Sequence, residues 1–191
     1  MAANDLTTAA KVKEHLSYTS ADADPLLARL VTAASSAIQR YTNRDIVQTA
    51  YNEVRDGTGG TRMLLRQFPA QEPTLVRVDG VTISKRTSQP GAGWVFDGIR
   101  VLSLDGYRFE RGFGNVEIAY TAGWLLASMP AEIEQAAIEL AALMFRQRKR
   151  IGDQSLTVSA GSGHETIAYA MSAMTPTTKL ILDEFKEVAP T

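Results

Sequence analysis

Hydrophobic residues recur at helical spacing along the first part of the chain. Asp24 followed by Pro25 is the favoured pairing of an N-cap with a first helical residue, and the pattern that follows predicts a helix over 24–43. A weaker amphipathic stretch predicts a shorter helix over 5–16, with Thr7 or Thr8 as its N-cap. The residues that form the apolar face of the longer helix are Leu27, Leu30, Val31, Ala34, Ile38 and Tyr41.

Between Ile46 and Trp124 the pattern changes to short runs of Val, Ile, Leu and Tyr. Asp-Gly pairs separate these runs, and such pairs favour hairpin turns. We therefore predict an antiparallel, meander-like β region. The pairs are Asp56-Gly57, Asp79-Gly80, Asp97-Gly98 and Asp105-Gly106. The predicted strands lie near 47–55, 62–66, 75–79, 81–85, 94–97, 99–104 and 115–120.

Helical spacing returns at Pro130, which we place at the first position of a third helix. Thr175-Pro176 predicts the start of a final helix, and the stretch 151–165 between them, rich in Gly and Ser, predicts an irregular loop. The apolar side of the final helix is predicted to face the core. Its residues are Leu180, Ile181, Phe185 and Val188.

These elements together predict an α+β fold. Each strong helix has a single apolar face, so the second and third helices are expected to pack on each other in a small bundle of about four helices. The β region is then an insertion between the second and third helices. In this interpretation residues 1–45 and 125–191 form the helical core, 46–124 form the inserted β region, and the whole is a single compact domain.

Composition and charge exclude several classes of protein. The 191 residues are 45% hydrophobic and 21% charged, which is typical of a globular chain. The formal net charge of -1 argues against a dedicated nucleic-acid binder, and the absence of cysteine excludes disulfides and thiolate metal sites. With no signal-like N-terminus and no long apolar run, we expect a soluble protein made in the cytoplasm, without a membrane partner.

The sequence contains no recognised catalytic motif. The two histidines, His15 and His164, lie far apart, and no His-based metal motif is present. The glycine-rich stretches 57–61 and 161–163 lack the lysine of a phosphate-binding loop, and the G-x-S-x-G pattern of hydrolases is absent. We therefore expect no enzymatic activity, no metal and no cofactor.

The basic residues at the end of the third helix are the one concentrated charge feature. Cations at a helix C-terminus stabilise it, but four of them exceed what capping requires. Both interpretations stay open, as a helix cap and as an electrostatic contact with phosphate or an acidic protein surface. The cluster comprises Arg146, Arg148, Lys149 and Arg150.

The order of these segments resembles the head-tail connector (adaptor) proteins of long-tailed bacteriophages and prophages. The most specific text is AAxxxIxxYTxR at the end of the second helix, from Ala33 to Arg44, and YTAGW from Tyr120 to Trp124. The helix that starts with Pro130-Ala131-Glu132-Ile133 and ends at the basic cluster also fits. The resemblance covers roughly residues 7–188.

The resemblance implies a structural virion subunit at the head-tail interface, made in the bacterial host cytoplasm. It would form a twelve-subunit ring below the portal protein, extend the channel for double-stranded DNA without sequence specificity, and dock a stopper or tail-completion protein. It implies contacts with neighbouring rings through the loop 151–165 and the tail 186–191. The candidate residues there are Gly152, Asp153, Gly161, Ser162, Gly163, His164, Lys186 and Thr191. The basic cluster would face the channel or an acidic portal surface.

The alternative is a soluble α+β module that binds a ligand or peptide in an aromatic-lined pocket of the β region. Aromatic residues are concentrated there, although strand aromatics usually belong to the core. Stoichiometry separates the two hypotheses, because a connector works as a ring. The aromatic residues are Trp94, Phe96, Tyr107, Phe109, Phe113 and Trp124.

Overall fold

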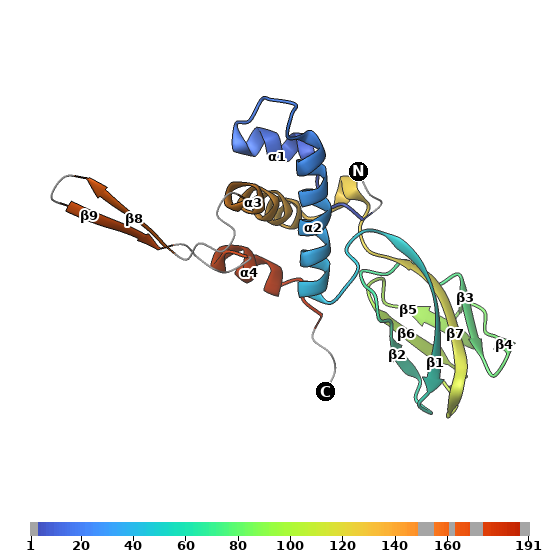
Figure 1. Ribbon diagram of the computed structural model, residues 1–191. Helices are drawn as coiled ribbons and strands as arrows, with labels where there is room; N and C mark the ends of the chain where they lie inside the picture. Colours follow the sequence, from blue (N-terminus) through green and yellow to red (C-terminus); the bar gives the residue numbers. More distant parts are fainter. Residues whose placement is uncertain (1–3, 149–154, 161–162, 169–173, 188–191) are drawn as a thin grey trace. The chain divides into compact units, whose positions relative to one another are not determined.

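The computed structural model describes residues 4–148, 155–160, 163–168 and 174–187 (Figure 1). It divides into two compact units. The helical unit comprises Met1–Arg44 and Met129–Thr191, and the β unit comprises Asp45–Ser128. Four α-helices and antiparallel sheets make the fold α+β, with the strands of the β unit inserted between the second and third helices, as the sequence predicts.

The helical unit is built on the packing of α2 (Asp24–Thr42) against α3 (Ala131–Gln147), which confirms the expected pairing of the two strong helices. α1 (Ala9–Leu16) and α4 (Pro176–Asp183) also pack on α3. Ser35, among the small residues at the middle of α2, accepts a hydrogen bond from the backbone N–H of Leu6 at 2.9 Å. The N-terminal segment therefore also lies against this part of α2.

The bounds of α2 agree with the prediction to within one residue, whereas α1 begins at Ala9 instead of near residue 5 and α4 already ends at Asp183. Thr8 caps α1, and its hydroxyl accepts from the N–H of Lys11 at 3.3 Å. Asp24 is wrong as the cap of α2, since the N-cap is Ala23 and Asp24 is the first helical residue. Pro130 is the N-cap of α3 rather than its first residue. A proline fits at either place, because neither position uses its missing N–H in the helix.

The predicted inner face of α4 is only partly correct: Ile181 and Phe185 are half-buried, and Val188 lies outside the described residues. Leu182 is fully buried, whereas Leu180, predicted to face inward, is 72% exposed. Thr178 is buried and its hydroxyl donates to Glu139 of α3 at 3.3 Å. On the exposed side, Tyr41 of α2 donates to Asp183 at 2.7 Å. These contacts set a rotation that the apolar spacing of a short helix does not define.

Two antiparallel sheets share one hydrophobic core in the β unit. The first has the order β1 (Thr49–Gly57), β7 (Gly112–Ala122), β3 (Leu75–Val78), β4 (Val81–Thr82). The second has the order β2 (Arg62–Leu64), β6 (Val101–Asp105), β5 (Gly93–Phe96). The largest fully buried core side chains include Leu65, Leu102, Phe109, Ile118 and Tyr120.

Only two of the four Asp-Gly pairs join paired strands. Asp79 and Gly80, at φ 50° and 77°, turn β3 into β4. Asp97 lies in the turn between β5 and β6, where its carboxylate accepts three backbone N–H groups; burial opposes the effect, but these donors lower its pKa. By contrast, β1 pairs with β7 and β2 with β6. The predicted meander would pair β1 with β2 and β6 with β7. Both pairings are wrong, because strands far apart in the sequence pair in their place.

The predicted irregular loop 151–165 is also wrong for its described residues. β8 (Ser155–Ala160) and β9 (Gly163–Ala168) form a two-stranded antiparallel sheet. The missed signal is Gly161-Ser162, a two-residue turn sequence between two runs that contain β-branched residues.

Candidate functional site

Two residues of the basic cluster, Arg146 and Arg148, lie in the described part of the chain. Arg148 is the C-cap of α3, and its guanidinium donates to the carbonyl of Phe145 at 2.6 Å and lies 3.6 Å from that ring's centre. It therefore stabilises the helix end, as the capping interpretation requires. Arg146, on the last turn, is exposed. Lys149 and Arg150 lie outside the described residues.

The described end of the chain docks on the C-terminus of α2. The N–H of Glu187 donates to the carbonyl of Thr42 at 2.9 Å, and Arg44 donates to the carbonyl of Phe185 at 3.2 Å. The Nζ of Lys186 lies 4.8 Å from the centre of the Tyr41 ring. Of the two candidate residues in the tail, Lys186 and Thr191, Lys186 is described, and it is held against α2.

Two further candidates lie at the start of β9, where Gly163 pairs with Ala160 and His164 pairs with Ser159. The structure places them on a strand, not in an irregular loop. The remaining candidates, Gly152, Asp153, Gly161, Ser162 and Thr191, lie outside the described residues.

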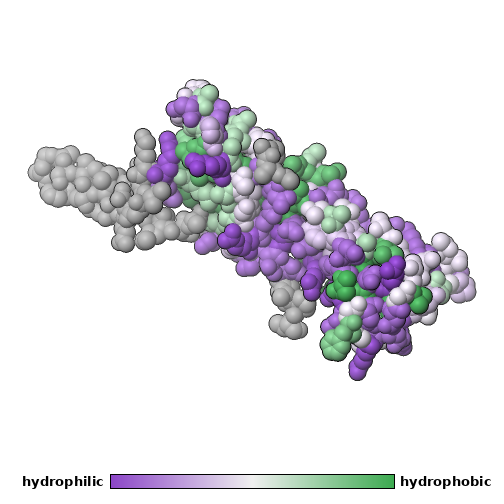
Figure 2. Space-filling view, turned by 45° about the vertical axis from the view of Figure 1, so that its right-hand side comes forward, coloured by the Kyte–Doolittle hydropathy of each residue, from purple (hydrophilic) through white to green (hydrophobic). Residues whose placement is uncertain are grey.

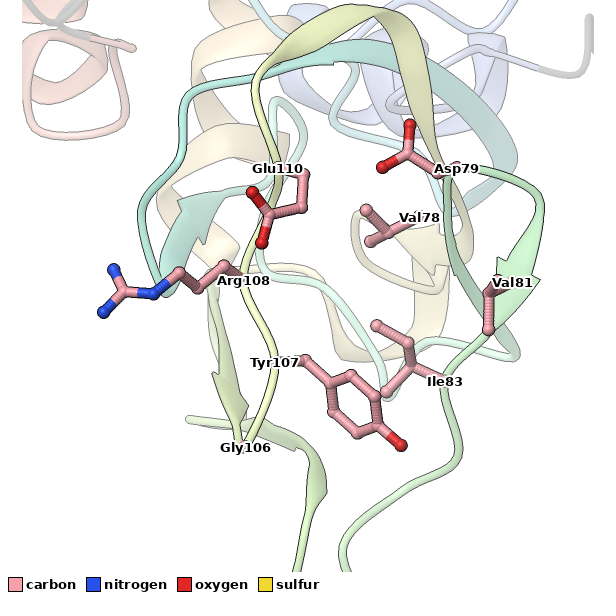
Figure 3. A pocket seen from close by; sticks show the side chains of 8 residues that line it. All are labelled: Val78, Asp79, Val81, Ile83, Gly106, Tyr107, Arg108 and Glu110. Atoms are coloured by element: carbon pink, nitrogen blue, oxygen red, sulfur yellow. The ribbon is translucent and has the colours of Figure 1, made fainter.

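A pocket opens in the β unit between the β3–β4 hairpin and the segment 106–110 (Figure 3). Its volume is about 580 Å³. The ring of Tyr107 lies beside Ile83, whereas the guanidinium of Arg108 points away from the apolar side chains. The lining residues are Val78, Asp79, Val81, Ile83, Gly106, Tyr107, Arg108 and Glu110.

This pocket differs from the aromatic-lined site of the alternative hypothesis. Of the six aromatic residues, Tyr107 alone lines it. Trp94 and Phe109 are buried in the core, and Phe113 is 97% exposed. The concentration of aromatic residues in the sequence therefore reflects mostly core packing, and it does not support the ligand-binding alternative.

Phe113 is the most exposed of the large hydrophobic residues of the described chain. It lies at the start of β7 between two glycines, near the register shift at which Gly57 pairs with Gly112. Hydrophobic atoms reach the surface of the β unit among hydrophilic ones (Figure 2). The local signal for this exposure is Gly112-Phe113-Gly114, an aromatic residue between two glycines, although strand aromatics usually belong to the core.

Metal-binding clusters and membrane-length apolar helices are both absent from the described residues. No three or more His, Asp or Glu side chains in this part of the chain come together as they would to hold a metal ion. Within the same residues, no helix has the length and apolar character needed to cross a membrane.

Comparison with known proteins gives matches along nearly the whole chain. The family model described as head completion protein matches residues 5–188. No curated protein matches the sequence.

Solved structures of gene transfer agent (GTA) particles share the fold. A chain in "Neck of empty GTA particle computed with C6 symmetry" is 21% identical, with a TM-score of 0.61 over 96% of this chain and 90% of that one. A chain in "Neck of native GTA particle computed with C12 symmetry" is 19% identical, with a TM-score of 0.59 over 95% and 89%. A chain from the virion of the native particle gives 21% identity and a TM-score of 0.61, over 96% and 90%. Because the family model covers nearly every residue, the chain belongs to the head completion protein family, which confirms the resemblance to phage head-tail proteins.

Proposed function

We propose that this protein is a head-tail connector subunit of a phage-like particle, and that twelve copies form a ring below the portal. The observation that carries the proposal is the family match over residues 5–188. The fold shared with neck chains of particles solved with C6 and C12 symmetry supports a ring. In this role the protein extends the DNA channel and docks the next stopper or tail component, and it acts in the virion after synthesis in the host cytoplasm.

The decisive experiment combines particle composition with absolute mass. Particles purified from the producing cells are tested for the chain by mass spectrometry, and the isolated protein is measured by light scattering and negative-stain imaging. The chain in the particles, with rings of twelve times the subunit mass, is the expected result. Its absence from particles overturns the proposal. A monomer in isolation, together with incorporation into particles, means that the portal is needed for assembly.

The basic end of α3 supplies the proposed contact with DNA or with an acidic portal surface. Arg148 caps the helix end, whereas Arg146 is exposed. A substitution of Arg146 therefore tests the electrostatic contact without removing the Arg148 cap. Lys149 and Arg150 complete the proposed contact.

We expect Arg146→Gln to lower the DNA content of particles or the affinity of the ring for its portal. Each lost phosphate contact should also reduce the log–log salt dependence of DNA binding by about one per subunit. Arg29→Gln removes an exposed cation from α2 and is the matched control. Equal DNA content and portal affinity in both variants would exclude Arg146 from the contact.

The β8–β9 hairpin and the tail 186–191 are the proposed contacts with neighbouring rings. Within the described chain, β8 and β9 form a two-stranded sheet of their own, and such hairpins are marginally stable in water. Hydrogen exchange at Ser155–Ala160 and Gly163–Ala168 is therefore expected to be fast in the free subunit and slow in the ring. Strong, equal protection in both states would contradict this contact, and the β1–β7 pair provides the internal control for a protected ladder.

A further inference from the structure

The exposure of Phe113 is unusual because the chain around it is firmly held. The N–H of Gly114 donates to the Asp56 carboxylate at 2.7 Å. The side-chain oxygen of Asn115 accepts from the N–H of Gly57 at 2.9 Å. Gly112, on the other side of Phe113, pairs with Gly57 of β1. Phe113 is thus a large apolar side chain, 97% exposed, on a backbone held before and after it.

Two of the glycines near Phe113, Gly57 and Gly112, leave too little room for a side chain. A Cβ on Gly112 would lie 2.7 Å from the Cγ of Asn115, and one on Gly57 would lie 1.7 Å from the carbonyl oxygen of Glu110. The tip therefore presents one aromatic ring from a preorganised backbone. Preorganisation of this kind lowers the entropy lost on binding, and aromatic anchors dominate many interfaces.

The pocket of the same unit has apolar walls and a volume that suit an aromatic ring. Its wall includes Val81, 62% exposed, and Tyr107, 46% exposed, beside buried Val78 and Ile83. An engineered protein cavity of about 150 Å³ holds benzene. The volume of about 580 Å³ is therefore ample for a phenyl ring. Since Phe113 is almost fully exposed in its own chain, it does not fill this pocket there.

Charge around the two features also matches. Exposed Arg111 precedes Phe113 by two residues, and the carboxylates of Asp79 and Glu110 lie at the pocket (Figure 3). A ring entering the pocket from another chain would bring Arg111 towards these two carboxylates, while the guanidinium of Arg108, which also lines the pocket, points away from its apolar side chains. This pairing favours a second copy of this chain as the occupant.

We propose that Phe113 of one copy inserts into the pocket of a second copy, beside Val81 and Tyr107, with Arg111 facing Glu110. The inference rests on the proposed function and names one contact between successive subunits. A protruding side chain of one copy that enters a pocket of the next gives a head-to-tail interface, and such interfaces close into rings when the rotation allows it.

Photo-cross-linking in assembled particles tests this contact. Phe113 is replaced by a phenylalanine that carries a diazirine on its ring, so that the aromatic anchor is kept, and purified particles are irradiated. The expected product is a covalent dimer of this chain, linked from position 113 to a peptide containing 78–83 or 106–110. The same analogue at Leu180, exposed on the helical unit, is the control and should not link to these peptides.

A competition between variants measures the strength of the contact. Cells produce wild-type and variant chains together, and mass spectrometry gives their ratio in particles. Phe113→Ala and Val81→Asp are expected to be depleted about tenfold or more, as for an interface anchor. Ile99→Ala, which truncates another exposed apolar residue of the β unit, should be incorporated equally. All three positions are exposed, so thermal melting should show all three variants folded.

The outcomes separate the two proposals. Cross-links from 113 to other virion proteins only, or to position 113 of another copy only, overturn this contact and leave the connector function standing. Equal incorporation of Phe113→Ala and Ile99→Ala also overturns it. Absence of the wild-type chain from particles overturns the connector function, and this contact fails with it.

Discussion

Individual polar residues are built into the interior of the β unit. The rings of Tyr51 and Tyr120 stack with centres 5.5 Å apart. The Tyr120 hydroxyl donates to Glu53, and that of Tyr51 donates to Asp45 at 2.7 Å. Burial, reinforced by these carboxylate acceptors, raises the pKa of both phenols above the usual value. The network therefore depends on both phenols keeping their protons.

Stability should fall in alkaline solution because of this network. A folded-state pKa above the unfolded value means that the stabilisation is complete below about pH 10 and is lost as the pH rises further. For Tyr120, which is 2% exposed, we expect the free energy of unfolding to fall by about 1 kcal/mol per pH unit above that point. Urea unfolding between pH 8 and 11 measures it.

Tyr51→Phe is the comparison for this pH dependence. The variant keeps the stacked ring and removes one titrating hydroxyl, so its loss of stability above pH 10 should be less steep than in the wild type. Parallel curves for the two proteins would show that Tyr51 does not contribute.

At the scale of elements, α4 shows how tertiary contacts select one face of a short helix. Leu180 and Leu182 are two positions apart and therefore lie on nearly opposite sides. The buried Thr178 and its bond to Glu139 turn Leu182 inward. The same two leucines give a matched experiment within one helix.

Leu182→Ala is expected to destabilise the protein by about 2–5 kcal/mol, because it removes a fully buried side chain and leaves a cavity. Leu180→Ala, at a position 72% exposed, should change the free energy of unfolding by about 0.5 kcal/mol or less. Urea unfolding of both variants checks this. A larger loss for Leu180→Ala would mean that the opposite face of α4 is buried.

At the scale of the whole molecule, the β unit has a hydrophobic core of its own, and the first and last parts of its chain contact each other. The clustered core residues of this unit lie between Met63 and Ala122. Near its two ends, Val47 bridges Trp124, and the N–H of Gln48 donates to the carbonyl of Trp124 at 2.9 Å. These features fit an insertion that can fold by itself.

Residues 45–128 expressed alone are therefore expected to fold. Far-UV circular dichroism should show β structure, and urea should unfold the fragment cooperatively. Leu102→Ala in the fragment removes a fully buried core side chain and should lower its stability by about 2–5 kcal/mol. A fragment without cooperative unfolding would show that the β unit needs the helices.

The sequence by itself determined the α+β class, the order of the helices and of strands β1 to β7, and the family, because helical and strand spacing and the segments 33–44 and 120–124 are local patterns. Four Asp-Gly pairs carry the same local signal, yet only those at 79–80 and 97–98 join paired strands. Strand pairing such as Gly57 with Gly112 was decided by the tertiary structure. The inward side of α4 and the pocket were decided in the same way. Each depends on contacts between residues far apart in the chain, and no local pattern encodes them.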